Sequence, residues 1–182
     1  EFGHFIEWNY DGQLDWFLMV YERHPDLCRC VRVMNRFYRD TPAMYEVEDS
    51  WEGFKWLAAD DRERSLTVFM RTDRAGGSVV CMTNFTSAFY PQYRFGLPEP
   101  GVVTECFNTD LKEFGGSNQY NAGPLRAREE PCNGLPWSVE VCVPPLATVY
   151  FTYAKDPKPE EKPRKAPSKA KKAPPEKEGD SR

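Results

Sequence analysis

The stretch LTVFMRTDRAGGSVVCMTNF, Leu66 to Phe85, decides the fold predicted for this chain. Its first six residues, 66–71, alternate Leu, Val and Met with Thr, Phe and Arg, which is the period of a half-buried strand. The turn DRAGG, Asp73–Gly77, follows, and Ser78–Phe85 is a second apolar segment. Two such segments around a glycine-rich turn predict an antiparallel β-hairpin.

Short strand-like segments continue on both sides of this hairpin. They are expected at 54–57, 93–95, 102–107, 125–129, 137–143 and 147–153. With the hairpin they give seven or eight short antiparallel strands in about 100 residues, which is typical of a β-sandwich. The sequence therefore predicts a mainly β fold, with an antiparallel β-sandwich at 46–154.

One helix is expected ahead of these strands, over Asp26–Arg39. His24-Pro25-Asp26 marks its start, because proline suits the first helical turn and an acid complements the dipole at the N-terminal end of a helix. Apolar residues then recur at spacings of 4, 3 and 4, at Leu27, Val31, Met34 and Tyr38. The arginines on the other side, which we expect to face solvent, are Arg29, Arg32, Arg36 and Arg39. Thr41-Pro42 ends the helix.

The last 28 residues, 155–182, differ in composition from the rest. They hold 10 basic and 6 acidic residues and six prolines, without an aromatic or β-branched side chain. Such a segment buries too little apolar surface to order itself, so a disordered tail is expected. The preceding 154 residues carry a net charge of −8. That charge repels phosphates, so nucleic acid is not expected as a partner.

The sequence indicates neither a membrane span nor a secretory signal, since no apolar run approaches 18 residues. Six cysteines are scattered along the chain, no C-x-x-C occurs, and His4 and His24 are the only histidines. We therefore expect no metal and no cofactor. The expectation is a cytoplasmic protein with reduced, mostly buried thiols.

The first sixteen residues, EFGHFIEWNYDGQLDW, interleave five aromatic residues with four carboxylates. They follow neither a strand nor a helix period, so a loop or strand end is expected. Aromatic rings stack on sugar faces and carboxylates accept hydroxyl protons, so the stretch is suited to a carbohydrate-type ligand. The alternative is a buried aromatic hinge that packs one domain onto another.

No catalytic centre follows from the residues themselves. The carboxylates show no spacing that singles out a glycosidase pair, and neither histidine has a recognisable nucleophile beside it. Gly115-Gly116-Ser117 lies between strands, where it does not form a phosphate loop. Asn84-Phe85-Thr86 has the form of a glycosylation acceptor, but we assign it to the hairpin.

Several blocks, taken together and in order, resemble one family. They are EFGHFIEWN with LDW, VRVMNRFYRDTPAMYE (Val31–Glu46), GFKWLAADDRERSLTVFMR (Gly53–Arg71), TNFT (Thr83–Thr86), YRFGLPEPG (Tyr93–Gly101), FNTD (Phe107–Asp110), FGGSN (Phe114–Asn118) and PPLAT (Pro144–Thr148). The chain resembles the C-terminal portion of 1,4-α-glucan (glycogen) branching enzymes of the α-amylase superfamily, over about 1–153.

This resemblance implies a transferase of glycogen biosynthesis, which moves α-1,4-glucan segments to form α-1,6 branches. The family's catalytic carboxylates lie upstream of EFG, so no catalytic residue is expected in this chain. The implied division is the end of a (β/α)8 barrel at 1–45, with its last βα element, an all-β domain at 46–154 and the tail. The missing N-terminal catalytic barrel would be a partner of the chain, and a fragment alone is expected to be inactive.

By the same resemblance, residues 1–3 end the eighth barrel strand, and the loop after them lies near the glucan cleft. Trp8 is expected to stack on glucose, with Glu7 and Asn9 binding hydroxyl groups, while Phe2 and Phe5 pack. The partner is then an α-1,4-glucan such as glycogen or amylose. A severed barrel element exposes an apolar helix face, so self-association is expected.

Two alternatives remain open. One is a stand-alone, non-catalytic module that binds glucan or has a structural role. The other is a neighbouring member of the superfamily, such as a debranching or trehalose-forming enzyme, although the order of the blocks favours branching enzymes.

Overall fold

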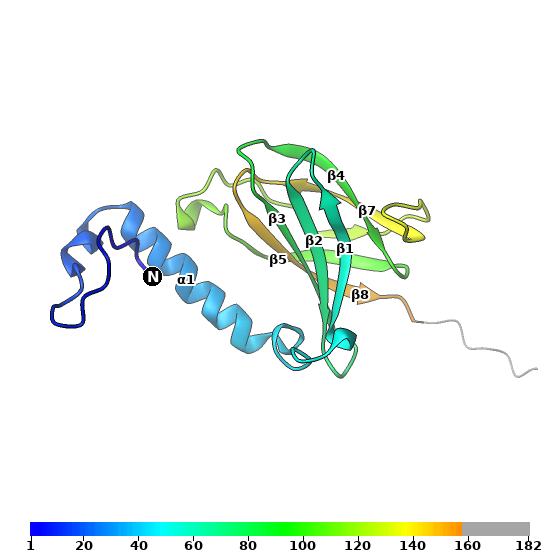
Figure 1. The fold of residues 1–182 in the computed structure, drawn as a ribbon. Coiled ribbons are helices and arrows are strands. Elements are labelled where there is room, and N and C mark those ends of the chain that lie inside the picture. Colours follow the sequence, from blue (N-terminus) through cyan, green and yellow to red (C-terminus); the bar gives the residue numbers. More distant parts are fainter. Residues whose placement is uncertain (158–182) are drawn as a thin grey trace, which may run out of the picture.

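The computed structural model describes residues 1–157 (Figure 1). Most of the predicted disordered tail, 158–182, lies outside the described residues. The first residues of that predicted tail belong to the folded part, because Lys155 is the last residue of a strand. Asp156 then accepts a hydrogen bond from Nη1 of Arg126 at 3.1 Å. The sheet thus extends one residue past the predicted boundary at 154.

Helical segments come first along the chain and strands follow. The helical segments, with η for a 3-10 helix, are η1 (Trp16–Val20), α1 (Arg23–Asp40), η2 (Pro42–Met44), η3 (Trp51–Gly53) and, between strands, η4 (Lys112–Phe114). The strands are β1 (Phe54–Asp61), β2 (Leu66–Thr72), β3 (Ser78–Asn84), β4 (Tyr90–Leu97), β5 (Gly101–Asn108), β6 (Pro124–Arg126), β7 (Trp137–Val143) and β8 (Thr148–Lys155).

The strands form two antiparallel sheets. One has six strands in the order β1-β2-β3-β8-β5-β6, and the other pairs β4 with β7. The predicted hairpin is confirmed as β2–β3, with Leu66 opposite Asn84 and Thr72 opposite Ser78. The last strand, β8, lies in the interior of the large sheet, between β3 and β5. The expectation of a mainly β, antiparallel fold is therefore confirmed.

The hydrophobic core lies between the two sheets. In β2 the apolar alternation predicted from the sequence buries Leu66, Val68 and Met70 on the core side. Strands of both sheets contribute to the same cluster, which includes Phe95, Leu97, Val141, Val143, Val149 and Phe151. Because one core joins both sheets, residues 54–155 fold as one unit.

The side chain of Asn84 connects two chain segments at one end of this unit. It is 1% exposed, and its Nδ2 donates to the carbonyl groups of Ala88 and Pro144, each at 2.8 Å. Its Oδ1 accepts from the backbone N–H of Thr86 at 2.9 Å and from the Thr86 hydroxyl at 2.8 Å. The blocks TNFT and PPLAT are thus joined by hydrogen bonds of the buried Asn84 side chain.

A second buried polar side chain organises the connection between β5 and β6. The carboxylate of Asp110 is 7% exposed and accepts from the N–H and hydroxyl groups of Ser117 at 2.9 and 2.7 Å, and from the N–H of Gln119 at 2.9 Å. Gly116 crosses so near that a Cβ there would lie 2.1 Å from the carbonyl oxygen of Asp110. The FNTD and FGGSN blocks therefore form a single folded loop.

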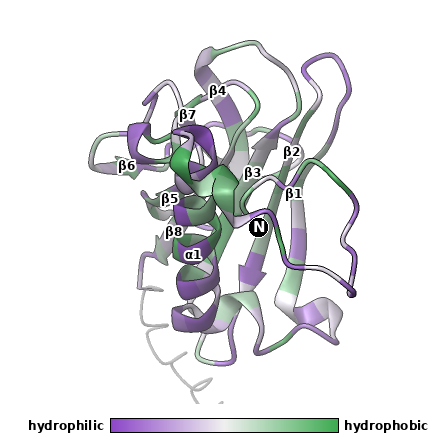
Figure 2. Cartoon of the chain, turned by 90° about the vertical axis from the view of Figure 1, so that its left-hand side faces the viewer, coloured by the Kyte–Doolittle hydropathy of each residue, from purple (hydrophilic) through white to green (hydrophobic). Residues whose placement is uncertain are grey.

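Helix α1 lies against the outer face of the large sheet, in front of β5 and β8 (Figure 2). Its Phe37 ring stacks on Phe107 at 5.7 Å and lies 5.1 Å from Tyr150, measured between ring centroids. The helix begins at Arg23, three residues before the predicted Asp26, and ends at Asp40. Aromatic contacts thus fix its C-terminal half on the β-domain.

The prediction that the α1 arginines face solvent is confirmed, since all four are exposed, but Arg29 and Arg23 also contact the β-domain. The Nη1 of Arg29 donates to the carbonyl of Glu113 at 2.5 Å, and Arg23 donates to the carbonyl of Gly115 at 2.8 Å. Both acceptors belong to the loop that Asp110 organises. The sequence could not show this, because the two partners are 84 and 92 residues away along the chain.

Candidate functional site

The residues predicted to bind glucan lie in the loop before η1. Figure 1 shows this N-terminal stretch beside the first turns of α1, away from the strands. Its base is held by Phe2, which is 5% exposed and stacks on Trp16 at 5.1 Å between ring centroids. The Phe2 carbonyl also accepts a hydrogen bond from Nδ1 of His24 at 2.6 Å. The loop is thus fixed to the start of α1.

His4 joins the two limbs of the same loop. Its Nδ1 lies 2.8 Å from the carbonyl oxygen of Ile6, and its Nε2 accepts from the backbone N–H of Asp15 at 2.9 Å. The Asp15 carboxylate also lies 3.3 Å from Nε2. Both nitrogens are therefore used for the shape of the loop, which leaves His4 with a structural role.

Glu7, Trp8 and Asn9 lie together at the tip of the loop, and all three are exposed. The Trp8 side chain is 72% exposed. The side chain of Asn9 accepts from the N–H of Asp11 at 3.0 Å, within a tight turn. The structure therefore presents an open aromatic ring with a carboxylate and an amide beside it.

Phe2 packs as predicted, whereas within this chain Phe5 does not. The Phe5 side chain is 78% exposed, although its ring meets that of His24 edge-on at 5.1 Å. Within the described residues nothing covers the outer side of Phe5. The stretch has neither a strand nor a helix period, so the sequence did not indicate which of the two phenylalanines would be buried.

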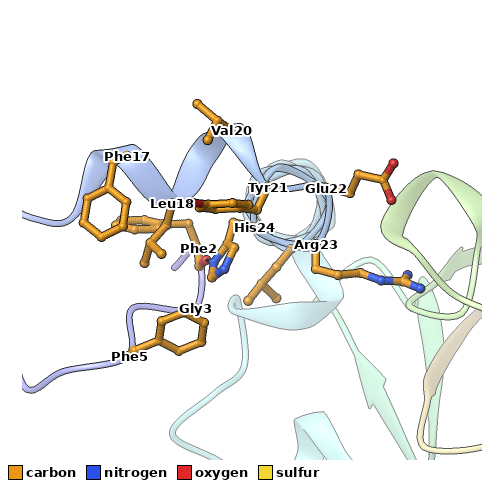
Figure 3. Close-up of a pocket in the computed structure, with 11 residues that line it drawn as sticks. Phe2, Gly3, Phe5, Phe17, Leu18, Val20, Tyr21, Glu22, Arg23 and His24 are labelled. Atoms are coloured by element: carbon orange, nitrogen blue, oxygen red, sulfur yellow. Dashed lines mark hydrogen bonds between the residues drawn. The ribbon is translucent and has the colours of Figure 1, made fainter.

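An apolar cavity of about 960 Å³ opens between the base of the loop and the start of α1 (Figure 3). Its lining is Phe2, Gly3, Phe5, Phe17, Leu18, Val20, Tyr21, Glu22, Arg23, His24 and Leu27. The predicted glucan contacts do not line it. Because Glu22 is the single carboxylate in this lining, the cavity offers no pair of acids for glycosyl chemistry.

Exposed apolar side chains continue from this cavity in both directions. On the loop and η1 they are Phe5, Ile6, Trp8, Tyr10, Trp16, Phe17, Val20 and Tyr21. On α1, Leu27 is 42% and Met34 is 37% exposed, so the predicted exposure of the apolar helix face at Leu27, Val31 and Met34 is confirmed for these two, while Val31 is half-buried. We call this set, from Phe5 to Met34, the apolar face. Of these, Phe5, Phe17, Val20, Tyr21 and Leu27 line one cavity, and so many exposed apolar side chains are unusual for a surface that faces water.

The thiols lie in different surroundings from those predicted. All six cysteines are free, but only Cys81 is buried, and Cys106 is exposed. The prediction of mostly buried thiols is therefore wrong. Burial raises the pKa of the Cys81 thiol to about 11, while hydrogen bonds with Tyr150 and Thr83 act in the opposite direction.

Residues 1–157 offer neither a metal site nor a membrane span. No group of three or more histidine, cysteine, aspartate or glutamate side chains there is arranged to hold a metal ion. In the same part of the chain, no helix has the length and apolar character needed to cross a membrane.

Comparison with known proteins gives two kinds of match. Residues 56–154 match the family described as the alpha amylase C-terminal all-beta domain. The chain is also 41% identical, over 152 residues, to the 1,4-alpha-glucan branching enzyme GlgB of Halothermothrix orenii. It is 39% identical over 151 residues to that of Nocardia farcinica, and 37% identical over 158 residues to that of Synechococcus elongatus.

These alignments include 83–86% of this chain but only 20–24% of the relatives. The chain thus spans about a fifth to a quarter of the length of the curated relatives it matches. The alignment of 152 residues is longer than the family match at 56–154. Even an alignment that ended at Arg182 would have to begin at Val31 or earlier. The similarity therefore includes part of α1 as well as the strands.

Proposed function

Because this chain belongs to the family of the alpha amylase C-terminal all-beta domain, we propose that it is the C-terminal part of a 1,4-α-glucan branching enzyme. The observation that carries the proposal is the single similarity that runs from α1 into the β-domain of relatives with that name. The β-domain alone would fit many members of the superfamily. The reaction would transfer α-1,4-glucan segments to form α-1,6 branches, in the cytoplasm, with carboxylates supplied from outside this chain.

The apolar face supports a second part of the proposal, the missing catalytic barrel as the partner. In this proposal residues 1–45 complete the barrel, and the barrel covers Phe5, Phe17, Val20 and Leu27. Those side chains surround a cavity whose lining is mostly apolar, as expected for half of a domain core. The relatives, of which this chain spans 20–24%, have ample additional length for such a domain.

The loop tip would then lie at the mouth of the barrel. Trp8 is proposed to stack on a glucose ring of the α-1,4-glucan, while Glu7 accepts from its hydroxyl groups and Asn9 accepts from or donates to them. Their exposure is consistent with this role, since a ligand reaches them without displacing other side chains. We expect no metal, cofactor, nucleic acid or membrane to take part.

The test is a comparison of the 182-residue chain with a hybrid that places the upstream part of the Halothermothrix orenii relative before Glu1. Branching of amylose is followed by the loss of iodine staining and by debranching of the product. We expect no turnover by the chain alone and turnover by the hybrid. Turnover by the chain alone, or an inactive but folded hybrid, would refute the proposal.

The loop is tested in the same hybrid. Trp8→Ala should lower kcat/KM on amylose by about tenfold, the cost of one well-placed aromatic contact. The matched control is Tyr120→Ala, because Tyr120 is another exposed aromatic (54%) but lies beyond β5. Equal activity of the two variants would remove Trp8 from the proposed site.

The apolar face is tested in the 182-residue chain by size exclusion. The chain should self-associate as its concentration rises, and Phe17→Ser should weaken that association. Phe85→Ser is the control, since Phe85 is similarly exposed (64% against 62%) but lies outside the apolar face. A monomer at all concentrations would contradict the proposed contact with a barrel.

The alternative of a stand-alone glucan-binding module predicts a different result. It requires the 182-residue chain to be retarded in a glycogen-containing gel while the hybrid remains inactive. That combination would favour the module, and retardation together with an active hybrid would favour the branching enzyme.

A further inference from the structure

The guanidinium of Arg71, on the outer face of the large sheet, is not satisfied. Its Nε and Nη2 are both shut off from solvent, and neither has a hydrogen-bond partner among the described residues. These two N–H groups point in the same direction and form the fork with which arginine binds both oxygens of a carboxylate. A buried, charged donor without an acceptor costs free energy. The fork is therefore suited to a carboxylate that none of residues 1–157 provides.

Arg71 lines a cavity of about 380 Å³, where the segment between α1 and β1 crosses the sheet. Phe54, its neighbour in the β1–β2 ladder, also lines this cavity, and Glu48–Trp51 form the rim. Glu48 and Asp49 are exposed, and neither binds the fork. A free anion at the fork would be repelled by these two carboxylates. An occupant that carries cations beside its own carboxylate would match both the guanidinium and the rim.

The C-terminal end of β8 lies at the same end of the large sheet as Arg71. Arg71 is opposite Val79 in the β2–β3 ladder, and Val79 is opposite Thr152 in the β3–β8 ladder. Two strand spacings, about 10 Å, therefore separate Arg71 from Thr152. Lys155 follows Thr152 by three residues, so its Cα lies about 10 Å further along the sheet and about 14 Å from that of Arg71.

The chain beyond this point brings carboxylates within reach of the fork. The five residues after Pro157 are Lys158-Pro159-Glu160-Glu161-Lys162. Glu160 is five residues beyond Lys155, and five extended residues span up to about 17 Å. That span exceeds the separation of about 14 Å that the strand spacings give, and the glutamate and arginine side chains add to the reach.

The order of charges in this stretch complements that of the cavity. Its adjacent glutamates, Glu160 and Glu161, have a lysine two residues before them and another directly after them. The fork, in turn, has carboxylates of the rim beside it. A glutamate bound in the fork would thus bring the lysines next to the acidic rim, where opposite charges attract. This complementarity favours residues 158–162 over a free anion.

The rim is held in place by its own contacts. The Ser50 hydroxyl caps η3 by accepting from the N–H of Glu52 at 3.2 Å. Upstream, a carboxylate oxygen of Glu46 accepts from the N–H of Arg74 at 3.2 Å, which ties the segment to the β2–β3 turn. The cavity therefore has a defined shape before any occupant arrives.

We propose that residues 158–162 fold back over this end of the large sheet, and that one carboxylate of the pair Glu160–Glu161 binds the Arg71 fork. Because the fork is shut off from solvent, exposed side chains of the rim turn aside as the carboxylate enters. The contact holds the segment between α1 and β1 under a strap that continues from the last strand. Its outer charge pairs face water, so raised salt weakens the strap. The inference does not depend on the proposed function.

The first experiment is a limited digestion of the 182-residue chain with a protease that cleaves after glutamate. The bond after Glu161 is compared with the bond after Glu176, since both join glutamate to lysine in the same C-terminal stretch. Cleavage after Glu161 should be about tenfold slower, as expected when the segment is bound for about nine-tenths of the time. Equal rates at the two bonds would overturn the proposal.

Three variants test whether the fork causes this protection. Arg71→Met removes the donors at nearly constant length, and Arg71→Lys keeps the charge but lacks the fork. Both should raise the rate of cleavage after Glu161 about tenfold, to that after Glu176. Arg74→Met is the matched control, because Arg74 is an exposed arginine of the adjoining turn, and it should leave the protection unchanged. Protection that survives both Arg71 variants, or that Arg74→Met abolishes equally, would refute a role for the fork.

The second experiment follows the Nε–H signal of Arg71 by NMR in chains whose fold is not altered at the cavity. Glu160→Gln combined with Glu161→Gln should shift this signal. Glu176→Gln combined with Glu178→Gln removes the same charge further along the chain and should leave the signal in place.

A carboxylate of the rim is the competing partner for the fork. If that partner were correct, Glu48→Gln or Asp49→Gln would shift the Arg71 signal, whereas the double replacement at Glu160 and Glu161 would not. That result would overturn the proposal. Neither experiment measures branching activity, so the proposed function is judged separately by the hybrid.

Discussion

The replacement Asn84→Ala should destabilise the β-domain by about 3 kcal/mol. Asn84 is 1% exposed and its side chain makes four hydrogen bonds of 2.8–2.9 Å, two as donor and two as acceptor. Alanine leaves the carbonyl of Pro144 without this donor in a buried position. Each buried group that loses its partner costs roughly 1–3 kcal/mol, and water can reach the groups nearer the surface. We therefore place the total at the cost of one to two unsatisfied groups.

The measurement is urea unfolding of the 182-residue chain, followed by circular dichroism, with a thermal scan in parallel. A loss of about 3 kcal/mol corresponds to a fall in Tm of about 14 °C for a domain of about 100 residues. Asn35→Ala is the matched control, because Asn35 is exposed on α1, where alanine is the better helix former. It should leave stability unchanged or slightly increased. Surface substitutions usually change the free energy of unfolding by less than about 0.5 kcal/mol. A change no larger than that for Asn84→Ala would refute the reasoning.

Three further predictions concern other parts of the fold. Stability should fall as the pH rises from about 9 towards 11, because the thiols of Cys81 and Cys106 keep their protons in the folded chain (pKa about 11 for each), while the unfolded chain loses them near 9.0; Cys81→Ala should reduce, without abolishing, that pH dependence of urea unfolding. Gly116→Ala should cost more than about 2 kcal/mol, since its Cβ would clash with the Asp110 carbonyl, whereas Gly12→Ala, with no atom within 4 Å, should be neutral in the same assay. Phe37→Ala should raise amide exchange throughout α1 relative to the strands, because the helix loses its ring contacts with β5 and β8; unchanged exchange would show that the arginine contacts suffice.

The strands could be predicted because their signal is local. The turn at 73–77 and the alternation at 66–71 identify β2 and β3 without reference to any other part of the chain. The helix is predictable for the same reason, although its start at Arg23 lies ahead of the apolar pattern. Arg23 contacts a loop 92 residues further along the chain, and no local pattern carries that information.

The candidate sites depend more on tertiary contacts. The family resemblance alone points to the loop tip, Glu7–Asn9, whereas the residue types are equally compatible with a buried hinge. The Phe2 side chain is buried, as expected for the hinge, whereas the Trp8 side chain is exposed, as expected for a ligand contact. Each interpretation therefore applies to a different part of the loop. The unpaired fork of Arg71 had no sequence signal at all. It arises because β1 places Phe54 opposite Arg71 and the preceding segment folds over both.

The interior position of β8 constrains the order in which the β-domain can form during synthesis. The hairpin β2–β3 joins residues close in sequence and can assemble as soon as both strands have left the ribosome. The strand β5, however, reaches β3 only through β8, which is made some forty residues later. Until then the nascent chain presents an open edge of β3 and an incomplete core. The strand that joins the two halves of the large sheet, β8, is therefore made last. A ribosome that stalls before Thr148 leaves these two halves separate.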